Sequence, residues 1–326
     1  MLRDLGVDSA FFVSHEHRLI SDYGFDQIVI PERSAADSPE AELKKAAIRK
    51  AVIQEVMEPH DVILHDVAIH AELYELGVVQ GLFQGYIYRA RKDQSDPARF
   101  IADRAPDVDV VYVLGKAGET DHRHGIRLLG VADVVRRRRG EKPIWGSDDD
   151  GIKVVVMAGG GGHADAEAFI DAAVSGVLHA CAAQDLRATL SVITGPYFRG
   201  TVRVPPAPHV KVRVQSYLGP EYSPYEGTDA VVSQGGYNTV QELKLSGVRA
   251  VAVPGERLRD DQHARLSELD VHDSVAVSSA DAGQISASLA KLLLSPAGAP
   301  VSGTQPRGAF EIAQDIVGTR SRAGRT

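Results

Sequence analysis

The stretch Thr228-Asp-Ala-Val-Val-Ser-Gln-Gly-Gly-Tyr-Asn-Thr-Val-Gln-Glu242 places a strand, a glycine turn and a helix start within fifteen residues. Its short β-branched run, Ala230-Val-Val232, is typical of a buried parallel strand. The pair Gly235-Gly236 allows a tight turn, and Asn238 or Thr239 is suited to cap the helix that follows. Because the first turn of a helix leaves free N–H groups with a partial positive charge, the stretch predicts a phosphate site.

Glu242 lies about one turn into the predicted helix, where its carboxylate can reach a sugar hydroxyl beside a bound phosphate. Acidic residues hold ribose in a similar way in dinucleotide-binding folds. The alternative is an ordinary capped strand-to-helix turn in which the glutamate has a capping role. The stretch alone does not separate these two interpretations.

A second glycine turn, in Val154-Val-Val-Met-Ala-Gly-Gly-Gly-Gly-His163, favours the phosphate site. A helix is predicted after it, over residues 164–183, so the order strand, loop and helix occurs twice. Consecutive glycines leave a concave backbone surface that suits a diphosphate, and here they are Gly159, Gly160, Gly161 and Gly162. No Lys-Ser/Thr pair follows them and their spacing differs from a dinucleotide fingerprint, so neither a P-loop nor that fingerprint is present.

A third strand is predicted over Val248-Arg-Ala-Val-Ala-Val-Pro254, and a polar loop with Arg259-Asp-Asp-Gln-His263 follows it. Ligand sites in doubly wound sheets lie at the carboxyl ends of the strands. The loops after the three predicted strands therefore belong to one candidate site.

In this order, the elements resemble the donor-binding half of B-fold glycosyltransferases. The resemblance is closest to the bacterial group that includes the lipid-linked N-acetylglucosaminyltransferase of peptidoglycan synthesis and related predicted transferases. It covers residues 150–295 and rests on four motifs in sequence: Gly-Gly-Tyr-Asn-Thr-Val-Gln-Glu242, Gly247-Val, Val-Pro254 and Asp261-Gln262. The donor in that group is a nucleoside diphosphate sugar.

The resemblance also implies roles for single residues. It implies that Glu242 binds the ribose, that the backbone near Tyr217-Leu218 meets the base, and that Asp261 and Gln262 touch the donor sugar. The residues it implies for the diphosphate are Gly159 to Gly162 and the helix start at Gly236, Tyr237, Asn238 and Thr239. It implies no cofactor besides the donor substrate.

Composition agrees with a two-domain enzyme. A chain of 326 residues with 44% hydrophobic content can form two cores, and a net charge of −8 argues against a general nucleic-acid binder. No apolar run approaches the ~20 residues of a membrane span, and no signal-peptide pattern opens the chain, so we expect a cytoplasmic protein. The single cysteine, Cys181, excludes an internal disulfide and is expected as a packed thiol in a helix.

The first half alternates predicted strands with helices, which indicates a parallel α/β sheet. Strands are expected at 10–13, 27–30, 62–64 and 110–114, and a long helix at 40–57. The fold class is thus α/β, with two Rossmann-like domains facing across a cleft. We assign residues 1–135 to an acceptor-side domain, 136–151 to a linker, 152–300 to the nucleotide-sugar domain and 301–326 to a partly disordered tail. The arginine run 136–139 is expected to be solvated linker, and a short helix at 310–317 is expected to pack on the first domain.

The N-terminus departs from the resembling family, in which the first domain opens with a strand and a glycine-rich loop before a helix. The end of that helix resembles Met1-Leu-Arg-Asp-Leu-Gly-Val-Asp8, so this sequence lacks the first strand, and unpaired strand edges are expected. The missing loop carries acceptor contacts in relatives, and in several the general base. Three explanations stay open: a start codon upstream, completion of the fold by another chain, or loss of catalysis in the family manner.

Transfer from a sugar diphosphate needs a stabilised leaving group and a base for the acceptor hydroxyl. N–H donors at two helix starts can stabilise the leaving group without a metal. Base candidates are His15 and His17 after the first predicted strand, and His65 and Asp66 after another, although each histidine has the alternative of a surface or satisfied side chain. Asp121-His-Arg-His124 is interpreted as a polar loop rather than a metal site.

The sequence therefore predicts a metal-independent glycosyltransferase that uses a nucleoside diphosphate sugar, with uridine favoured as the base. The acceptor, the donor sugar and the oligomeric state have no signal in the sequence. One alternative is a nucleotide-sugar hydrolase or epimerase of the same fold. Another is a non-catalytic nucleotide-sugar-binding partner of an active transferase.

Overall fold

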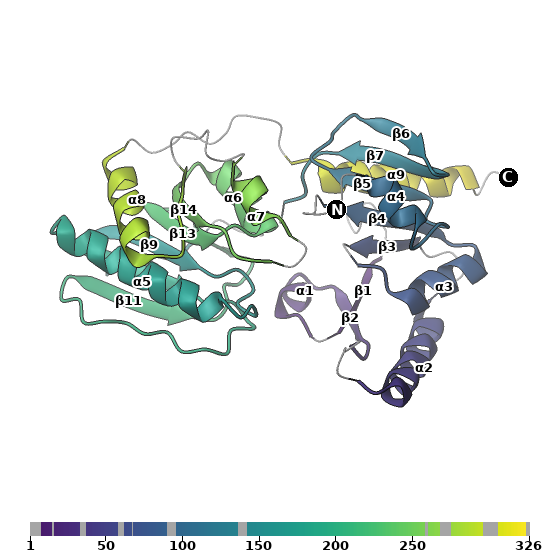
Figure 1. The fold of residues 1–326 in the computed structure, drawn as a ribbon, viewed down its shortest axis with the longest axis horizontal. Coiled ribbons are helices and arrows are strands. Elements are labelled where there is room, and N and C mark those ends of the chain that lie inside the picture. The colour runs from purple at the N-terminus through teal and green to yellow at the C-terminus, as the bar shows by residue number, and fades with distance from the viewer. Residues whose placement is uncertain are drawn as a thin grey trace. The chain divides into compact units, whose positions relative to one another are not determined.

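The computed structural model describes residues 8–14, 16–32, 37–57, 62–66, 68–89, 96–135, 142–257, 260–267, 275–295 and 306–323. The chain divides into two compact units (Figure 1). The first unit comprises Met1–Val134 with Gln305–Thr326, and the second comprises Val135–Thr304. The linker predicted at 136–151 thus falls at the start of the second unit, while most of the predicted tail belongs to the first.

The described residues of the second unit form a six-stranded sheet in which all neighbouring strands are parallel. Its strands are β9 (Ile152–Met157), β10 (Ala188–Ile193), β11 (Val210–Gln215), β13 (Ala230–Gln234), β14 (Arg249–Val253) and β15 (Val275–Val277). Their order in the sheet is β11-β10-β9-β13-β14-β15. Counted along the chain this is 3-2-1-4-5-6, the order of dinucleotide-binding Rossmann folds.

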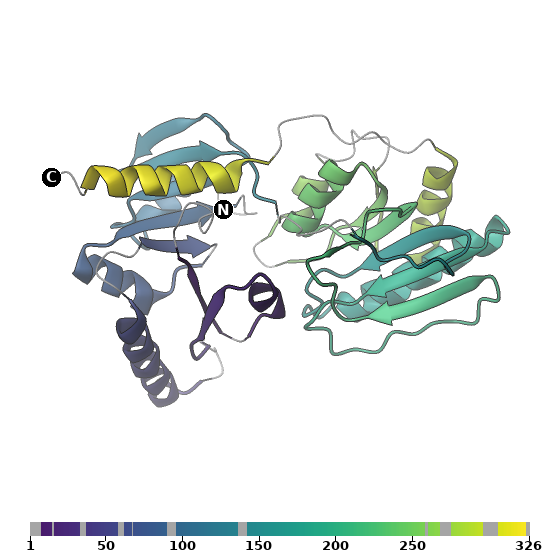
Figure 2. The same ribbon diagram turned by 180° about the vertical axis from the view of Figure 1, so that it is seen from behind.

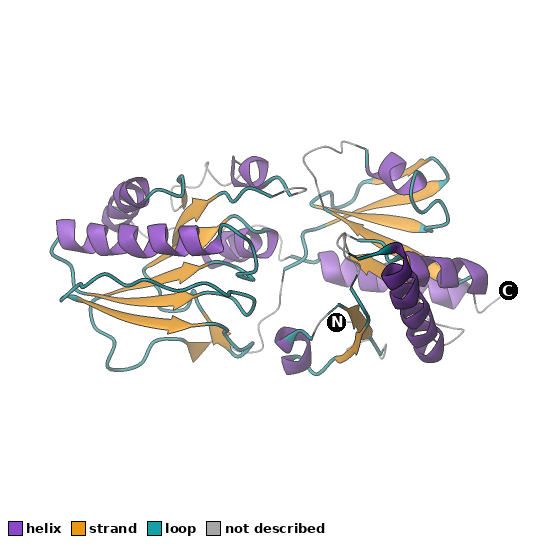
Figure 3. Ribbon diagram, turned by 60° about the horizontal axis from the view of Figure 1, so that its bottom comes forward, coloured by secondary structure: helices purple, strands orange, loops and turns teal. Residues whose placement is uncertain are grey.

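Helices cover both faces of this sheet, as the layers in Figure 3 show. Helices α5 (Ala166–Ala183) and α8 (Ala282–Leu294) pack on one face, and α6 (Tyr237–Ser246) and α7 (Gln262–Ser267) on the other. Successive strand residues alternate between the two cores: Val154 and Val156 contact the α5 side, and Val155 the α6 side. Burial on both faces explains the continuous apolar runs in the sequence.

Helix α5 is, among the described residues, the one helix long and apolar enough to cross a membrane, with a mean hydropathy of 1.3. Its buried side chains, including Phe169, Ile170 and Val174, pack on the sheet in the same core as α8. The helix is therefore a core helix of the second unit. Cys181 lies in this core, where burial raises the pKa of its thiol, and the prediction of a packed thiol is confirmed.

The described residues of the first unit form a five-stranded sheet with the order β3-β4-β5-β7-β6. Its strands are β3 (Val62–Asp66), β4 (Phe83–Tyr88), β5 (Val110–Leu114), β6 (Thr120–Arg123) and β7 (Ile126–Val131). All pairs are parallel except the hairpin of β6 and β7. The accompanying helices are α2 (Pro39–Val56), α3 (Ala71–Gln80) and α4 (Pro97–Ala102).

A separate parallel pair joins β1 (Ala10–Val13) to β2 (Asp26–Val29), with α1 (Arg18–Asp22) between them. In the part of the chain that the structure describes, neither the second edge of β1 nor the outer edge of β3 pairs with another strand. The prediction of unpaired edges is confirmed for these residues. The fully buried Arg49 of α2 ties the pair to the unit, since it donates to Glu72 of α3 at 2.8 Å and to the carbonyl of Pro31 after β2 at 3.1 Å.

The C-terminal helix α9 (Gly308–Ala323) packs on the sheet of the first unit (Figure 2). Asp315 accepts hydrogen bonds at 2.9 Å from both the Tyr112 hydroxyl and Nη1 of Arg127, while Ile312 and Ile316 join the core around β5 and β7. Burial raises the pKa of Tyr112, and the negative charge and hydrogen bond of Asp315 raise it further. The predicted packing of this helix on the first domain is confirmed, although the helix is longer than expected.

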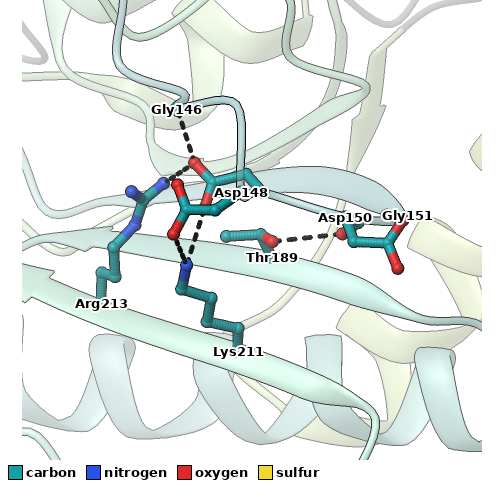
Figure 4. Close-up of polar contacts among 8 residues, drawn as sticks. Gly146, Asp148, Asp150, Gly151, Thr189, Lys211 and Arg213 are labelled. Atoms are coloured by element: carbon teal, nitrogen blue, oxygen red, sulfur yellow. Dashed lines mark hydrogen bonds and ion pairs between the residues drawn. The ribbon is translucent and has the colours of Figure 1, made fainter.

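The polar tract before β9 is part of the second unit rather than a solvated connection. Strand β8 (Lys142–Pro143) pairs with β12 (Tyr222–Ser223), and a carboxylate cluster follows (Figure 4). The fully buried side chain of Asp149 accepts from the N–H of Gly146 at 2.7 Å, from Arg213 at 2.5 Å and from Lys211 at 3.2 Å. The expected linker therefore ends by residue 142, and the arginine run at 136–139 lies outside the described residues.

Candidate functional site

The two glycine turns meet at the point where the strand order of the second unit reverses. Strands β9 and β13 are neighbours, with Ser233 of β13 opposite Met157 of β9. The chain leaves β9 toward β10 on one side and leaves β13 toward β14 on the other. Loops after adjacent strands run in opposite directions at such a point and leave a crevice, which is where open α/β sheets bind ligands.

The four glycines have different functions in the loop. Gly161 has a φ of +73°, and a Cβ there would lie 2.1 Å from the carbonyl oxygen of Thr194, so this glycine permits close packing against the loop after β10. A Cβ at Gly160 would meet only a ring carbon of Tyr197, at 3.6 Å. A Cβ at Gly159 would have no atom within 4 Å. Gly159 and Gly160 therefore leave an open stretch of main chain at the crevice.

Main-chain N–H groups at both turns have no acceptor among the described residues. They belong to Gly159, Gly160 and Gly162 in the first turn and to Gly236, Asn238 and Thr239 in the second. Unpaired N–H groups at a helix start form an anion-binding surface. The geometry is thus suited to a ligand with phosphate or another anionic group.

Neither helix at the crevice is capped by the side chain of its N-cap residue. Helix α6 begins after Gly236, which has no side chain, and the N-cap residue of α5, Asp165, makes no capping hydrogen bond. Ser38, Asp96 and Asp281 cap α2, α4 and α8, whereas α1 and α3 in the first unit also begin without a side-chain cap. The expectation that Asn238 or Thr239 caps α6 is therefore wrong, because the glycine turn starts the helix earlier and leaves both residues in its first turn.

A largely buried cation links the loop after β14 to the residue before α5 and to the end of β13. Arg257, which follows β14, donates through Nη1 to both carboxylate oxygens of Asp165, at 2.9 and 2.8 Å. Its Nη2 donates to Oε1 of Gln234 at 3.0 Å, and Nε2 of Gln234 donates to Asp165 at 3.3 Å. The Arg257 side chain is only 10% exposed. Partial burial and the Arg257 charge together lower the pKa of the neighbouring His163.

The residues predicted to touch the donor sugar shape the start of α7. Gln262 is 3% exposed; its Oε1 accepts from the N–H of Gly255 at 2.8 Å and its Nε2 donates to Asp260 at 3.3 Å. Asp261 accepts from the N–H of Ala264 at 3.0 Å. Burial alone would raise the pKa of Asp260, but the hydrogen bond and charge of Arg265 lower it below its ordinary value. These hydrogen bonds join Gly255 and Asp260 to the start of α7.

The residues predicted for ribose and base lie on the α6 side of the sheet. Glu242 is 8% exposed, and its Oε2 accepts from the Tyr225 hydroxyl at 2.8 Å. Leu218, in the loop after β11, packs with Tyr225 against the core on this face. Glu242 is the sixth residue of α6 and lies beyond the first turn, where the capping glutamate considered above would lie. The sequence patterns did not single out Tyr225.

The catalytic candidates of the first unit have very different surroundings. His65 is 3% exposed and bonded to Gln84 at 3.1 Å, and burial lowers the pKa of its imidazole, so it is a satisfied core histidine. Asp66, the next residue, is 58% exposed at the carboxyl end of β3 and pairs with Arg89 at 2.9 Å. His17 precedes α1, and its N–H donates to Gln27 at 2.6 Å. His15 lies outside the described residues.

The Asp121–His124 segment is mostly strand β6, with its residues exposed on the edge of the sheet, rather than a loop. Asp121 accepts from Arg123 at 2.6 Å and from the N–H of His122 at 2.8 Å. Within the described residues, no group of three or more His, Cys, Asp or Glu side chains is arranged to hold a metal ion.

No model of a known protein family matches the chain, and no curated protein matches it in sequence. Solved structures do match its fold. The forosaminyltransferase SpnP of spinosyn biosynthesis has a TM-score of 0.61 at 13% identity, over 97% of this chain and 93% of that one. MurG of Acinetobacter baumannii has a TM-score of 0.54 at 14% identity, over 97% and 92% of the two chains. UGT89C1 of Arabidopsis thaliana, in complex with UDP, has a TM-score of 0.58 at 12% identity, over 98% and 94%.

These likenesses extend over nearly the whole chain, so the protein has the glycosyltransferase B-fold with its two Rossmann-like domains. The strand order of the second unit is that of a Rossmann-like domain, and its crevice lies where such sheets bind ligands. The sequence patterns located both turns. They did not reveal Arg257 and Asp165, although an arginine three residues after the proline that ends a strand is a signal that points to the crevice.

Proposed function

We propose that the protein is a glycosyltransferase that takes its sugar from a nucleoside diphosphate sugar, with uridine as the base. The observation that carries the proposal is the set of unpaired N–H groups in the glycine loop after β9 and at the start of α6, at the reversal point of the sheet. The UDP complexes of structural neighbours, UGT89C1 and LpCGTa, support the choice of nucleotide.

In the proposed complex the diphosphate contacts main-chain groups, and not only charged side chains. Its binding groups are Gly159, Gly160, Gly161, Gly162, Gly236, Tyr237, Asn238 and Thr239. Departure of the nucleoside diphosphate builds negative charge on the leaving group, and fixed N–H donors stabilise that charge without the cost of reorienting water. This chemistry needs no metal and no cofactor.

Glu242 is proposed to hold the ribose, and the backbone at Leu218 to contact the base. The loop with Asp261 and Gln262 is proposed to face the sugar. Gln262 contributes by holding that loop in shape, because both ends of its amide are bonded to neighbours. For the acceptor hydroxyl we propose Asp66 as the base ahead of His65, since the carboxylate is exposed and the imidazole is buried.

One observation favours a second candidate, a nucleotide-sugar-binding partner without transfer activity of its own. In the described residues of the first unit, one edge of β1 and one edge of β3 pair with no other strand, so the sheet is interrupted between them. Product analysis separates these alternatives. A transferred sugar supports the transferase, free sugar supports a hydrolase, an altered nucleotide sugar supports an epimerase, and tight binding without products supports the binding partner.

A cytoplasmic location is also proposed, because a lone buried cysteine fits a reducing compartment.

The first experiment is a thermal-shift screen of the full chain with UDP, a panel of UDP-sugars and inorganic pyrophosphate. Binding to the folded state raises the melting temperature by mass action. We expect UDP and at least one UDP-sugar to raise it. If no nucleoside diphosphate or sugar conjugate shifts a well-folded sample at saturating concentration, the proposed donor site is wrong.

A further inference from the structure

The crevice contains an ion pair that the proposed function leaves without a role. Asp165 occupies the N-cap position of α5, where a carboxylate usually bonds to the N–H groups of the first turn. It makes no such bond, and both of its oxygens accept from Arg257 instead. The pair thus keeps the carboxylate away from the helix start and holds a guanidinium near His163, the residue that directly follows the four glycines.

A bound diphosphate changes the balance of charge at this position. Asp165 is 38% exposed and follows Gly162 by three residues, so its charge repels an anion that binds at the glycine loop. Arg257 neutralises that charge in the present arrangement. Its Nε–H has no acceptor among the described residues, so the guanidinium has a donor left for a further anion. Phosphate competes well with carboxylate for the planar fork of an arginine.

We propose that Arg257 is a diphosphate-binding side chain and that Asp165 is its counter-ion, which releases the guanidinium to the phosphates when the nucleotide binds. The inference rests on the proposed function and adds to it a side-chain ligand that comes from the third loop of the crevice. Gln234 retains Arg257 at the crevice during the exchange, because its Oε1 accepts from Nη2, on the other arm of the fork. At 10% exposure, the contact between guanidinium and phosphate is poorly screened by water.

The two members of the pair are then expected to have opposite effects on affinity. Arg257→Gln removes a charged hydrogen-bond donor and weakens binding of UDP and of inorganic pyrophosphate by about tenfold or more. Asp165→Asn keeps an acceptor for Arg257 but removes the repelling charge, so it tightens binding of both ligands. If the ion pair only held the loops together, both variants would change the affinity for these ligands in the same direction.

Titration calorimetry on the full chain, with UDP, pyrophosphate and uridine, tests the proposal. Uridine lacks phosphates, so its affinity is expected to stay unchanged in both variants. Asp171 of α5 and Arg203, whose side chains bond at 3.0 Å, offer a matched control pair, Asp171→Asn and Arg203→Gln. Neither control is expected to alter the affinity for UDP. Melting temperatures of all variants establish that they are folded.

Unchanged UDP affinity in folded Arg257→Gln overturns the proposal, as does weaker UDP binding in Asp165→Asn. If Arg257→Gln does not fold, the Asp165 variant and Arg257→Lys decide: the lysine keeps the charge without the fork and is expected to bind more weakly than arginine. Wild-type chain that binds neither UDP nor pyrophosphate refutes the proposed function itself. Wild-type binding without the opposed signs refutes only the role of the ion pair.

Discussion

Replacement of Glu242 by alanine tests whether the crevice binds a nucleotide or only an anion. The glutamate is nearly buried on α6, and the Tyr225 hydroxyl bonds to its Oε2 at 2.8 Å. If its carboxylate also accepts from a ribose hydroxyl, Glu242→Ala removes that bond and leaves the N–H groups at the glycine turns intact. The variant is therefore expected to lose affinity for UDP and to keep its affinity for pyrophosphate.

The size of the effect follows from the contacts of the carboxylate. A hydrogen bond to a charged group contributes about 1.5–3 kcal/mol. Because one carboxylate oxygen is already bonded to Tyr225, we assign the ribose one such bond rather than two. The dissociation constant for UDP is then expected to rise by about 10- to 150-fold, since each 1.4 kcal/mol corresponds to a factor of ten.

Calorimetric titration of the wild type and the variant with UDP and with pyrophosphate measures both quantities. Tyr225→Phe is the control, because it removes the hydroxyl that orients the carboxylate and keeps the carboxylate itself. Its effect on UDP affinity is expected to be smaller than that of Glu242→Ala. A folded Glu242→Ala chain with wild-type affinity for UDP refutes the ribose assignment, and an equal loss for both ligands moves Glu242 to the diphosphate.

Three further variants address the glycine loop, the C-terminal helix and the buried histidine. Gly160→Val is expected to fold, because its side chain enters open space, and to lose UDP binding, because that space is the proposed place of the diphosphate. Gly161→Val is expected to unfold the second unit, because its Cβ would lie 2.1 Å from a carbonyl oxygen. Normal UDP binding by Gly160→Val contradicts the loop assignment. Asp315→Ala is expected to lower the unfolding free energy of the first unit by about 2–4 kcal/mol in denaturant titrations. Asp121→Ala on the exposed β6 is the control and is expected to leave it nearly unchanged. Burial lowers the pKa of His65 below 6.5, so the unfolded chain binds the proton more tightly and stability falls as the pH drops below that value. His65→Gln should therefore flatten the pH dependence of the melting temperature between about pH 7 and pH 5. An unaltered pH profile contradicts this expectation.

The sheets were predictable because burial on both faces gives short β-branched runs that differ from the surrounding helices. Val154 to Val156 and Ala230 to Val232 are such runs, and both are strands in the structure. The glycine turns after them were predictable for a similar reason, since few other residues permit the backbone to reverse at that point. Local patterns therefore sufficed for the elements that form the backbone of the site.

The side chains at the site depend on strand order, which local patterns do not contain. Arg257 and Asp165 are 92 residues apart and meet only because β13 lies between β9 and β14. In the first unit, the alternation of side chains between the two faces of a strand likewise decided which candidate is exposed. His65 and Asp66 are adjacent in β3, so they point to opposite faces; the histidine is buried against Gln84 and the aspartate reaches the exposed end.

A site formed by main-chain N–H groups depends on the path of the backbone more than on the identity of side chains. Strands β10 and β11 extend to one side of β9, and the chain then returns to place β13 on its other side. Helix α5 follows β9 and helix α6 follows β13, and the two helices pack on opposite faces of the sheet. The free N–H groups of the two glycine turns therefore approach the crevice from two directions. Strand order and the glycines at Gly159, Gly160 and Gly236 supply this arrangement. Side chains such as Glu242 and Arg257 then decide which anion the crevice prefers.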